Sequence, residues 1–162
     1  MTASDRMHIL ITDMSRADIP EICRLERECF SSPWSRSPFE EYLSRAGCVF
    51  LAAKSDGEIA GYIGMYSVLD EGNITNVAVF DAFRRRGIAE KLISELKSRC
   101  RQMRLSFVTL EVRAGNAAAI SLYEKCGFER VGSRRNYYDH PDEDAVLMTL
   151  SFEKGYKVNS EG

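Results

Sequence analysis

The sequence has little of what marks several protein classes. It contains only two histidines, His8 and His140, and the two lie far apart. Its five cysteines are Cys23, Cys29, Cys48, Cys100 and Cys126. They show no C-x-x-C spacing, so the usual zinc motifs are excluded and we expect no metal site. An odd set of cysteines favours free thiols in a reducing cytoplasm over a disulfide framework.

Long apolar runs are also absent. No stretch reaches the length of a membrane span, and Asp5, Arg6 and His8 stand where a secretory signal would need apolar residues. The 162 residues are 44% hydrophobic and 28% charged, which is typical of a globular domain. We expect one domain over residues 1–152, a polar tail over 153–162 and a cytoplasmic location without a membrane partner.

The net charge of −2 is small but unevenly distributed. Residues 84–104 carry eight Lys or Arg against two Glu, whereas four of the six residues 139–144 are acidic. The plain interpretation is two solvated faces. An acidic chain without interleaved aromatic and basic residues argues against nucleic-acid binding.

Two common phosphate-binding motifs are missing around residues 77–89. Neither G-x-G-x-x-G nor G-x-x-x-x-G-K-[ST] occurs there, yet a short apolar run is followed by three arginines, Gly87 and an amphipathic pattern. The apolar residues of that pattern are Ile88, Leu92, Ile93, Leu96 and Cys100. A strand, a Gly-containing loop and a helix start direct several backbone N–H groups to one point, which suits a phosphate.

The remaining patterns predict alternating strands and helices. We expect strands over 8–12, 49–53, 59–68, 74–79, 107–112, 128–131 and 145–151, and helices beginning after Ser15, Ser37, Gly87 and Asn116. Ser15 with Asp18 and Ser37 with Glu40 have the spacing of capping boxes, and Pro38 suits a first helical position. Asp56-Gly57 indicates a hairpin.

Three blocks of sequence resemble the GNAT N-acetyltransferases. Arg84-x-x-Gly87-x-Ala89 matches their Q/R-x-x-G-x-G/A acetyl-CoA loop, and residues 110–124 are similar to their second signature. Residues 135–138 resemble the hairpin segment of RimI-type members, which acetylate protein N-termini. The resemblance implies an α/β fold with a mixed, mostly antiparallel seven-stranded sheet, about four helices and a splay between strands 4 and 5.

The resemblance also implies a site for acetyl-CoA as cosubstrate. The residues expected to contact it are Val77, Ala78, Val79, Arg84, Arg85, Arg86, Gly87, Ile88, Ala89, Glu90, Asn116 and Tyr123. Backbone N–H groups of Val77 and Val79 would hold the developing oxyanion. Asn116 has a second interpretation as a helix N-cap.

Glu111 and Tyr123 are the implied catalytic pair. Glu111 interrupts an apolar strand, so it either faces a cleft or is paired, in water or with Arg113. The resemblance makes it the general base. Tyr123 reads alone as a core aromatic; the resemblance makes it the acid that protonates the leaving thiolate, near its ordinary pKa. Cys126 as an acyl carrier is disfavoured, because no histidine accompanies it.

For the acceptor we expect Pro33, Trp34, Tyr137 and Tyr138. Trp34 either covers the core or forms a wall of the acceptor cleft. Tyr137 and Tyr138 are neighbours on a strand, so at most one should face the cleft. The acidic residues 139–144 would favour a cationic peptide.

These interpretations combine into one functional prediction. The protein would transfer acetyl directly from acetyl-CoA to the N-terminal α-amine of a protein, by resemblance the N-terminal alanine of a ribosomal protein. It would act as a monomer or weak dimer. A small-amine or lysine side-chain acetyltransferase is the alternative enzyme, since fold does not fix the acceptor. A non-catalytic acyl-CoA sensor is the alternative outside enzymes.

Overall fold

A computed structural model describes residues 8–152 of the chain. The strands are β1 (Ile9–Asp13), β2 (Cys48–Ser55), β3 (Glu58–Val68), β4 (Glu71–Val79), β5 (Phe107–Arg113), β6 (Glu129–Tyr138) and β7 (Glu143–Ser151). The helices are α1 (Ile19–Cys29), α2 (Arg36–Leu43), α3 (Ile88–Gln102) and α4 (Ala117–Lys125), with short 3-10 turns η2 (Arg16–Asp18) and η3 (Asp81–Phe83). The expected tail over 153–162 lies outside the described residues.

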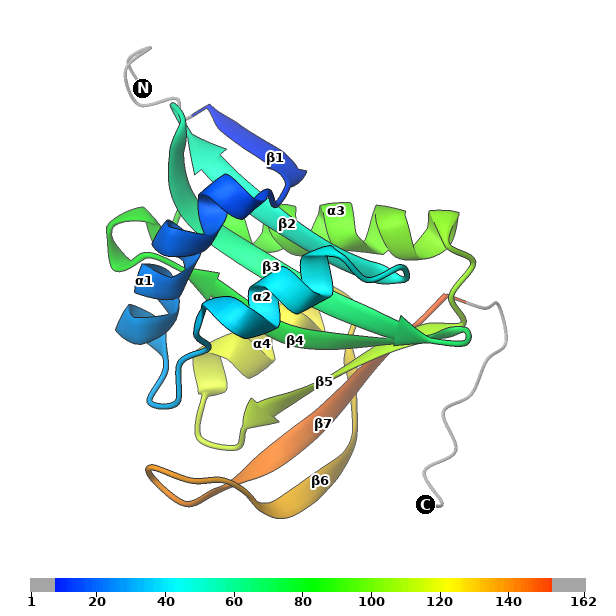
Figure 1. The fold of residues 1–162 in the computed structure, drawn as a ribbon. Helices are drawn as coiled ribbons and strands as arrows, with labels where there is room; N and C mark the ends of the chain where they lie inside the picture. Colours follow the sequence, from blue (N-terminus) through cyan, green and yellow to red (C-terminus); the bar gives the residue numbers. More distant parts are fainter. Residues whose placement is uncertain (1–7, 153–162) are drawn as a thin grey trace, which may run out of the picture.

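The seven strands form one sheet in the order β1-β2-β3-β4-β5-β7-β6. All neighbours are antiparallel except β4 and β5, which are parallel and pair only at residues 71–73 and 107–109. Beyond Asn73 the two strands diverge, and the sheet opens into two halves (Figure 1). The expected α/β fold with a splay between strands 4 and 5 is confirmed.

Apolar side chains pack on both faces of this sheet. One cluster contains the predicted stripe of α3, with Ile88, Leu92, Ile93, Leu96 and Cys100 all buried. The other cluster joins α1 and α2 to the opposite face and includes Leu25, Phe39 and Tyr62. Since burying a large apolar side chain contributes about 1.5–3 kcal/mol, these two clusters hold the helices on the sheet.

Several local predictions are correct. The Ser15–Asp18 capping box is present, because the Asp18 carboxylate accepts the Ser15 N–H at 2.9 Å. Asp56 and Gly57 adopt positive φ values of 49° and 85°, as a two-residue hairpin turn requires. No helix among residues 8–152 is long and apolar enough to cross a membrane.

Several boundaries differ from the prediction by one to a few residues, and three of them have a clear physical reason. α2 begins at Arg36 with Ser35 as its N-cap residue, so Ser37 and Pro38 lie inside the first turn, where proline is tolerated. β4 begins at Glu71 because a tight turn, with Leu69 at φ 56°, joins it directly to β3. β6 continues to residue 138 because it pairs along β7 through irregular register, which hides its strand pattern.

Candidate active site

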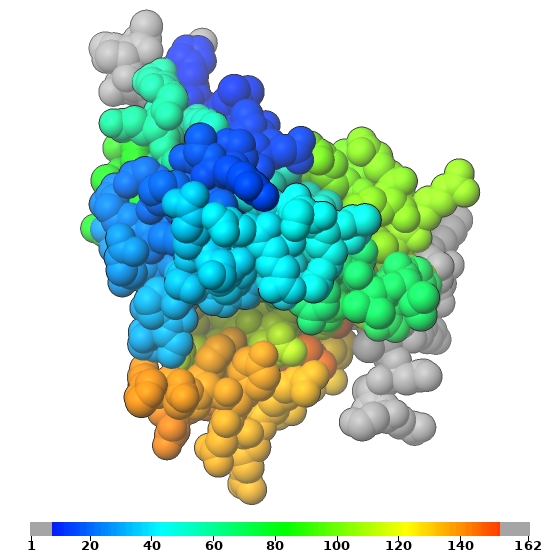
Figure 2. All heavy atoms as spheres, viewed as in Figure 1, coloured from blue at the N-terminus to red at the C-terminus, as the bar shows by residue number. Residues whose placement is uncertain are grey.

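The splay between β4 and β5 opens a cavity of about 410 Å³. Its walls come from the α1–α2 loop (residues 30–35), β4, β5, α4 and the β6–β7 hairpin (residues 129–151). Figure 2 shows the α1–α2 loop and the tip of the hairpin on either side of a hollow. Segments far apart in sequence therefore meet where the sheet is open.

The open edge of β4 presents backbone N–H groups to this cleft. The Phe80 N–H donates to the Ala60 carbonyl of β3 at 2.9 Å. Because successive N–H groups of a strand point to opposite sides, those of Val79 and Val77 point away from β3. Val77 lines the cavity, whereas the Ala78 side chain is buried in the α1–α2 cluster on the sheet's other face. The N–H groups of Val77 and Val79 therefore face the open side of β4, and their role as oxyanion donors stays a prediction.

The start of α3 forms a second hollow, of about 300 Å³, beside β4. Val79, Arg84, Arg85, Gly87, Ile88, Ala89, Glu90 and Leu122 are among its lining residues. Gly87 is the N-cap residue at φ 75°, and a Cβ built there would meet nothing within 4 Å. The first N–H groups of a helix have no acceptor within it, and the helix dipole makes their end positive. The loop has the geometry of an anion site.

The three arginines of this loop do not share one orientation. Arg84 bends back: its Nε donates to the Val79 carbonyl at 3.2 Å, and its Nη1 pairs with Asp81 at 3.3 Å. Arg85 has φ 64° and lines the hollow. Arg86 instead lies 6.0 Å from the Phe83 ring and is not among the lining residues. The Arg86 side chain therefore does not line this hollow, and a contact of Arg86 with a cofactor through its backbone N–H stays a prediction.

Glu111 lies on β5 and lines the larger cavity with its carboxylate partly exposed. Its ion-pair partner is Arg134 of β6, at 3.4 Å, and not Arg113. Arg113 pairs with Glu143 at 3.3 Å instead. The alternative of a Glu111–Arg113 bridge is therefore wrong: the two side chains lie on the same face of β5, but each pairs with a different residue of the β6–β7 hairpin.

Tyr123 lines the same cavity from α4 and is 9% exposed. Its ring packs edge-on against Phe128, with centroids 5.8 Å apart. Burial, together with the nearby Tyr138, raises the pKa of Tyr123 well above its ordinary value. The phenol therefore keeps its proton at neutral pH, and the expectation of an unshifted pKa is wrong in the free protein.

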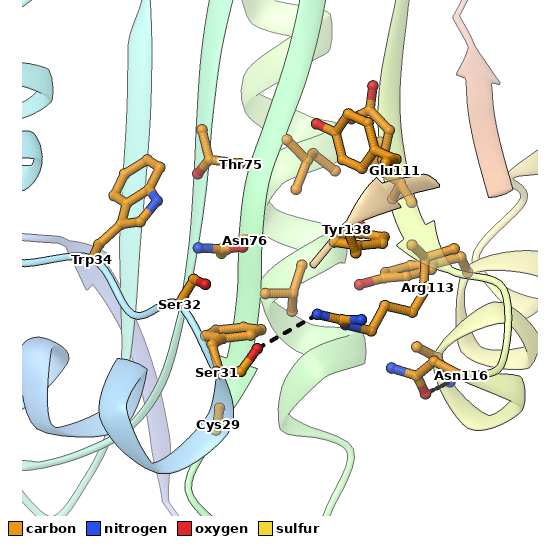
Figure 3. A pocket seen from close by; sticks show the side chains of 18 of the residues that line it. Cys29, Ser31, Ser32, Trp34, Thr75, Asn76, Glu111, Arg113, Asn116 and Tyr138 are labelled. Carbon is orange, nitrogen blue, oxygen red and sulfur yellow. Dashed lines mark hydrogen bonds between the residues drawn. The ribbon is translucent and has the colours of Figure 1, made fainter. Parts of the chain in front are cut away.

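Asn116 caps α4, as its second interpretation predicted. Its side-chain oxygen accepts the Ala119 N–H at 3.2 Å (Figure 3). The same residue lines the larger cavity, and its amide nitrogen is a donor at the cleft. Capping and a cleft contact are compatible, because the cap uses only the oxygen.

The acceptor residues are only partly placed as predicted. Trp34 lines the cavity and also stacks on Tyr42 at 5.5 Å, so it is both a wall and a cover. Pro33 is exposed and is not a lining residue. Tyr137 and Tyr138 both line the cavity, against the expected alternation, because Asn136 has φ 50° and the β6–β7 register is broken there.

Arg113 joins the two walls of the cleft, a role that the sequence did not reveal. Its guanidinium donates to the carbonyls of Asp139 and Pro141, each at 2.9 Å, and approaches the Ser31 hydroxyl at 3.5 Å (Figure 3). It also lies 4.5 Å from the centre of the Tyr138 ring. One side chain thus holds the hairpin tip and touches the α1–α2 loop.

Two acidic residues of the turn, Glu143 and Asp144, bond within the chain, whereas Asp139 and Asp142 are exposed. Glu143 accepts the Gly115 N–H at 2.6 Å in addition to its pair with Arg113, and Asp144 accepts the Asn136 N–H at 2.8 Å. The Glu143 bond fixes the loop before α4, and the Asp144 bond joins the two strands of the hairpin. The charge at these two positions is thus committed to structure, which weakens the expectation of a cationic peptide.

Glu26 is a second residue that the sequence did not single out. It lies on the buried face of α1 with no exposed surface. Its Oε1 accepts the Trp34 N–H at 3.2 Å and the Asn76 side-chain amide at 3.1 Å. Burial raises the pKa of Glu26 to about 7, although these bonds and the Tyr62 phenol lower it in part. The signal that could have found it is a glutamate at a buried position of α1, next to the apolar residues Ile22 and Leu25.

The Cys126 acyl carrier finds no support at this cleft, and Cys29, a cysteine that does line the cavity, has a thiol pKa that burial raises. Cys126 is not a lining residue, and burial raises the pKa of its thiol, which reduces its nucleophilicity at neutral pH. Within residues 8–152 no group of three or more His, Cys, Asp or Glu is arranged to hold a metal ion.

Comparison with known proteins agrees with this geometry. The sequence pattern of the Acetyltransferase (GNAT) family matches residues 19–128. The ribosomal protein bS18-alanine N-acetyltransferase of Escherichia coli K12 is 34% identical over 147 residues, covering 86% of this chain and 95% of that protein. N-alpha-acetyltransferase RimI of Mycobacterium tuberculosis is 34% identical over 154 residues, covering 91% and 95%.

Solved structures give the same result at the level of the fold. The crystal structure of the ribosomal-protein-S18-alanine N-acetyltransferase from Escherichia coli superposes with a TM-score of 0.84 at 31% identity, covering 93% of this chain and 97% of that one. Ard1 from Thermoplasma volcanium superposes with a TM-score of 0.83 at 26% identity, covering 90% and 99%. With its splayed sheet, its α3 loop and these RimI-type relatives, the chain belongs to the GNAT family of acetyltransferases.

Proposed function

We propose that the protein transfers an acetyl group from acetyl-CoA to the N-terminal α-amine of a protein, in a ternary complex without an acyl-enzyme. The observation that carries this proposal is the convergence of Glu111 and Tyr123 on one cavity at the open edge of β4. The acceptor class is supported by relatives named for the N-terminal alanine of ribosomal protein bS18. A ribosomal protein with an N-terminal alanine is therefore the proposed substrate.

The α3 end of the cleft fits the cosubstrate. Backbone N–H groups of residues 85–90 and the side chain of Arg85 would hold the phosphates, with Gly87 leaving room for a close approach. The amide of Asn116 would contact the pantetheine arm where that arm passes α4. The thioester would then reach the cavity between β4 and β5.

Deprotonating the acceptor is a modest task for an α-amine. With a pKa near 7.8, an α-amino group costs about 1 kcal/mol to deprotonate at pH 7, whereas a lysine side chain near 10.4 costs about 4.6 kcal/mol. Glu111, as a partly exposed carboxylate lining the cavity, would accept that proton directly or through a water. Arg134 would hold the carboxylate in place.

The reaction also needs stabilisation of the developing oxyanion and a proton for the leaving thiolate, which we assign to β4 and α4. The N–H groups of Val77 and Val79, which point away from β3, would stabilise the negative charge that develops on the thioester oxygen. Tyr123 would return a proton to the departing thiolate. Its raised pKa keeps the phenol protonated in the resting enzyme, ready to act as an acid and not as a base.

The test is acetyl transfer from labelled acetyl-CoA to an alanine-starting peptide, the same peptide with a blocked N-terminus, a lysine peptide and spermidine. We expect the free alanine peptide to be labelled, and Glu111→Gln to lower kcat by about 10²–10³-fold, in the range of general base catalysis. Glu124→Gln is the matched control, because Glu124 pairs with Arg130 on the surface. Labelling of spermidine or lysine instead would keep the reaction and overturn the acceptor. Binding of acetyl-CoA with no transfer would favour a sensor.

A further inference from the structure

The contacts of Glu26 connect two walls of the cleft that are far apart in sequence. The carboxyl belongs to α1, the Trp34 N–H to the α1–α2 loop, and the Asn76 amide to β4. Both Trp34 and Asn76 line the larger cavity, whereas Glu26 is entirely buried behind them. Figure 3 shows the Trp34 and Asn76 side chains on the same side of the pocket.

We propose that Glu26 is a positioning residue for the acceptor: through one carboxyl oxygen it fixes the α1–α2 loop, which carries Trp34, to β4 at Asn76. This inference rests on the proposed function, because it assigns Trp34 to the acceptor wall. Asn76 immediately precedes Val77, so the same contact sets the loop relative to the proposed oxyanion donors.

The arrangement is costly, which argues that it is kept for a purpose. Glu26 Oε2 and the neighbouring Tyr62 hydroxyl are both buried, and neither makes a well-directed hydrogen bond among the described residues, although the phenol lies close enough to lower the Glu26 pKa. A buried carboxyl without a cation is unfavourable when ionised. A glutamine could accept the same two N–H bonds without that cost. Stability alone therefore does not explain why this position carries a titratable glutamate.

The surroundings of Glu26 make its titration separable from that of other groups. The titratable groups that interact with it are Cys23 and Cys29 of α1 and Tyr62 of β3, and burial raises the pKa of each. All three are therefore neutral at neutral pH. Arg27 and Arg36 act on Cys23, and Arg84 acts on Cys29. Glu26 is thus the group here whose charge changes near pH 7.

Ionisation should tighten the loop. A carboxylate accepts the Trp34 and Asn76 N–H groups more strongly than a neutral acid does, since charge-assisted hydrogen bonds are about twice as strong. As pH falls through about 7, Glu26 takes up a proton and the tie to Trp34 weakens. Glu26→Gln mimics the neutral acid at every pH.

The first experiment measures peptide KM, kcat and coenzyme A affinity for Glu26→Ala and Asn76→Ala. We expect each variant to raise the peptide KM at pH 8 by at least fivefold, with kcat and the Kd for coenzyme A within twofold of wild type. Glu21→Gln is the control on the same helix, because Glu21 is exposed and pairs only with Arg24 in its surface bridge. An unchanged KM in a folded Glu26→Ala, or an equal loss of coenzyme A affinity, would overturn the proposal.

The second experiment uses Trp34, the single tryptophan of the chain, as a reporter. We expect its emission in the wild type to titrate between pH 6 and 8 with a midpoint near 7, and to stay flat in Glu26→Gln. The ratio of peptide KM values, Glu26→Gln over wild type, should fall toward one as pH falls from 8.5 to 6. An equal emission change in both proteins would contradict the tie between Glu26 and the loop.

These readouts separate the two proposals. If Glu26→Ala does not fold, Asn76→Ala and the pH comparison of Glu26→Gln with wild type decide the question. A wild-type protein that acetylates no peptide would contradict the proposed function, while the emission of Trp34 would still test whether Glu26 holds the loop.

Discussion

At the scale of single residues, Glu26 shows how a site can cost stability. Its pKa is raised from 4.5 to about 7 in the folded protein, so the native state binds a proton that the unfolded chain has released between these values. Stability therefore falls as pH rises from about 4.5 to 7, and the cost persists above pH 7. This is the opposite of a salt-bridged carboxylate, whose contribution is lost as pH falls.

Glu26→Gln should remove this dependence. We expect the variant to gain free energy of unfolding relative to wild type, with the difference growing by about 2 kcal/mol between pH 5 and pH 8. Urea unfolding at several pH values measures it, and Glu21→Gln at the surface provides the baseline. A difference that does not change with pH would contradict the raised pKa.

Residue identity was easier to predict from the sequence than residue partnership. Glu111, Tyr123, Asn116 and Trp34 all line the cavity, because motif spacing fixes their places on strands and helices. The partners of Glu111 and Arg113 come from the β6–β7 hairpin, about twenty or more residues away, and no local pattern encodes them. Glu26 was missed for the same reason, since its contacts span 8 and 50 residues.

At the scale of elements, one cation joins β5 to the tip of the β6–β7 hairpin. Arg113 of β5 holds the carbonyls of Asp139 and Pro141 and pairs with Glu143, so β5 and the hairpin tip move together. A planar guanidinium can make these bonds at once, whereas a lysine ammonium is a point donor on a flexible stem. We expect the hairpin to form one wall of the proposed acceptor site only while this clamp is intact.

Arg113→Ala should loosen that wall. We expect the peptide KM to rise about tenfold, equivalent to about 1.4 kcal/mol, with Arg113→Lys intermediate and the Kd for coenzyme A unchanged. Steady-state kinetics and limited proteolysis of residues 139–142 measure the two effects. Arg130→Ala on the outer edge of β6 is the control, since Arg130 pairs with Glu124 on the surface. Unchanged kinetics together with unchanged proteolysis would show that the hairpin needs no clamp.

Element boundaries were predicted well where side-chain chemistry marks them. The Ser15 capping box, the Asp56-Gly57 turn and the apolar stripe of α3 have such markers. The start of β4 and the length of β6 do not, because a two-residue turn with Leu69 and a broken register leave no regular pattern. The expected alternation of side chains failed at Tyr137 and Tyr138, because the β6–β7 register is broken next to them.

At the scale of the whole molecule, the cleft separates two halves of the sheet that pair over only three residues of β4 and β5. A ligand that fills the gap should therefore stabilise the entire domain. Coenzyme A at 100 times its Kd should add about 2.7 kcal/mol and raise Tm by about 5–10 °C. Pantetheine, which lacks the nucleotide phosphates, should give a smaller shift in the same thermal scan. Equal shifts would argue against phosphate binding at α3, and no shift with coenzyme A would contradict the cosubstrate.

The separate packing of the two faces of the sheet has a consequence for how such a protein can evolve. The α3 cluster stands behind the proposed cosubstrate loop, while the α1–α2 cluster stands behind Trp34 and the proposed acceptor wall. Because separate cores support them, we expect substitutions on the α1–α2 side to alter the proposed acceptor wall while the α3 side stays packed. We therefore expect that mutations can change which acceptor the protein prefers while the proposed binding site for acetyl-CoA is kept.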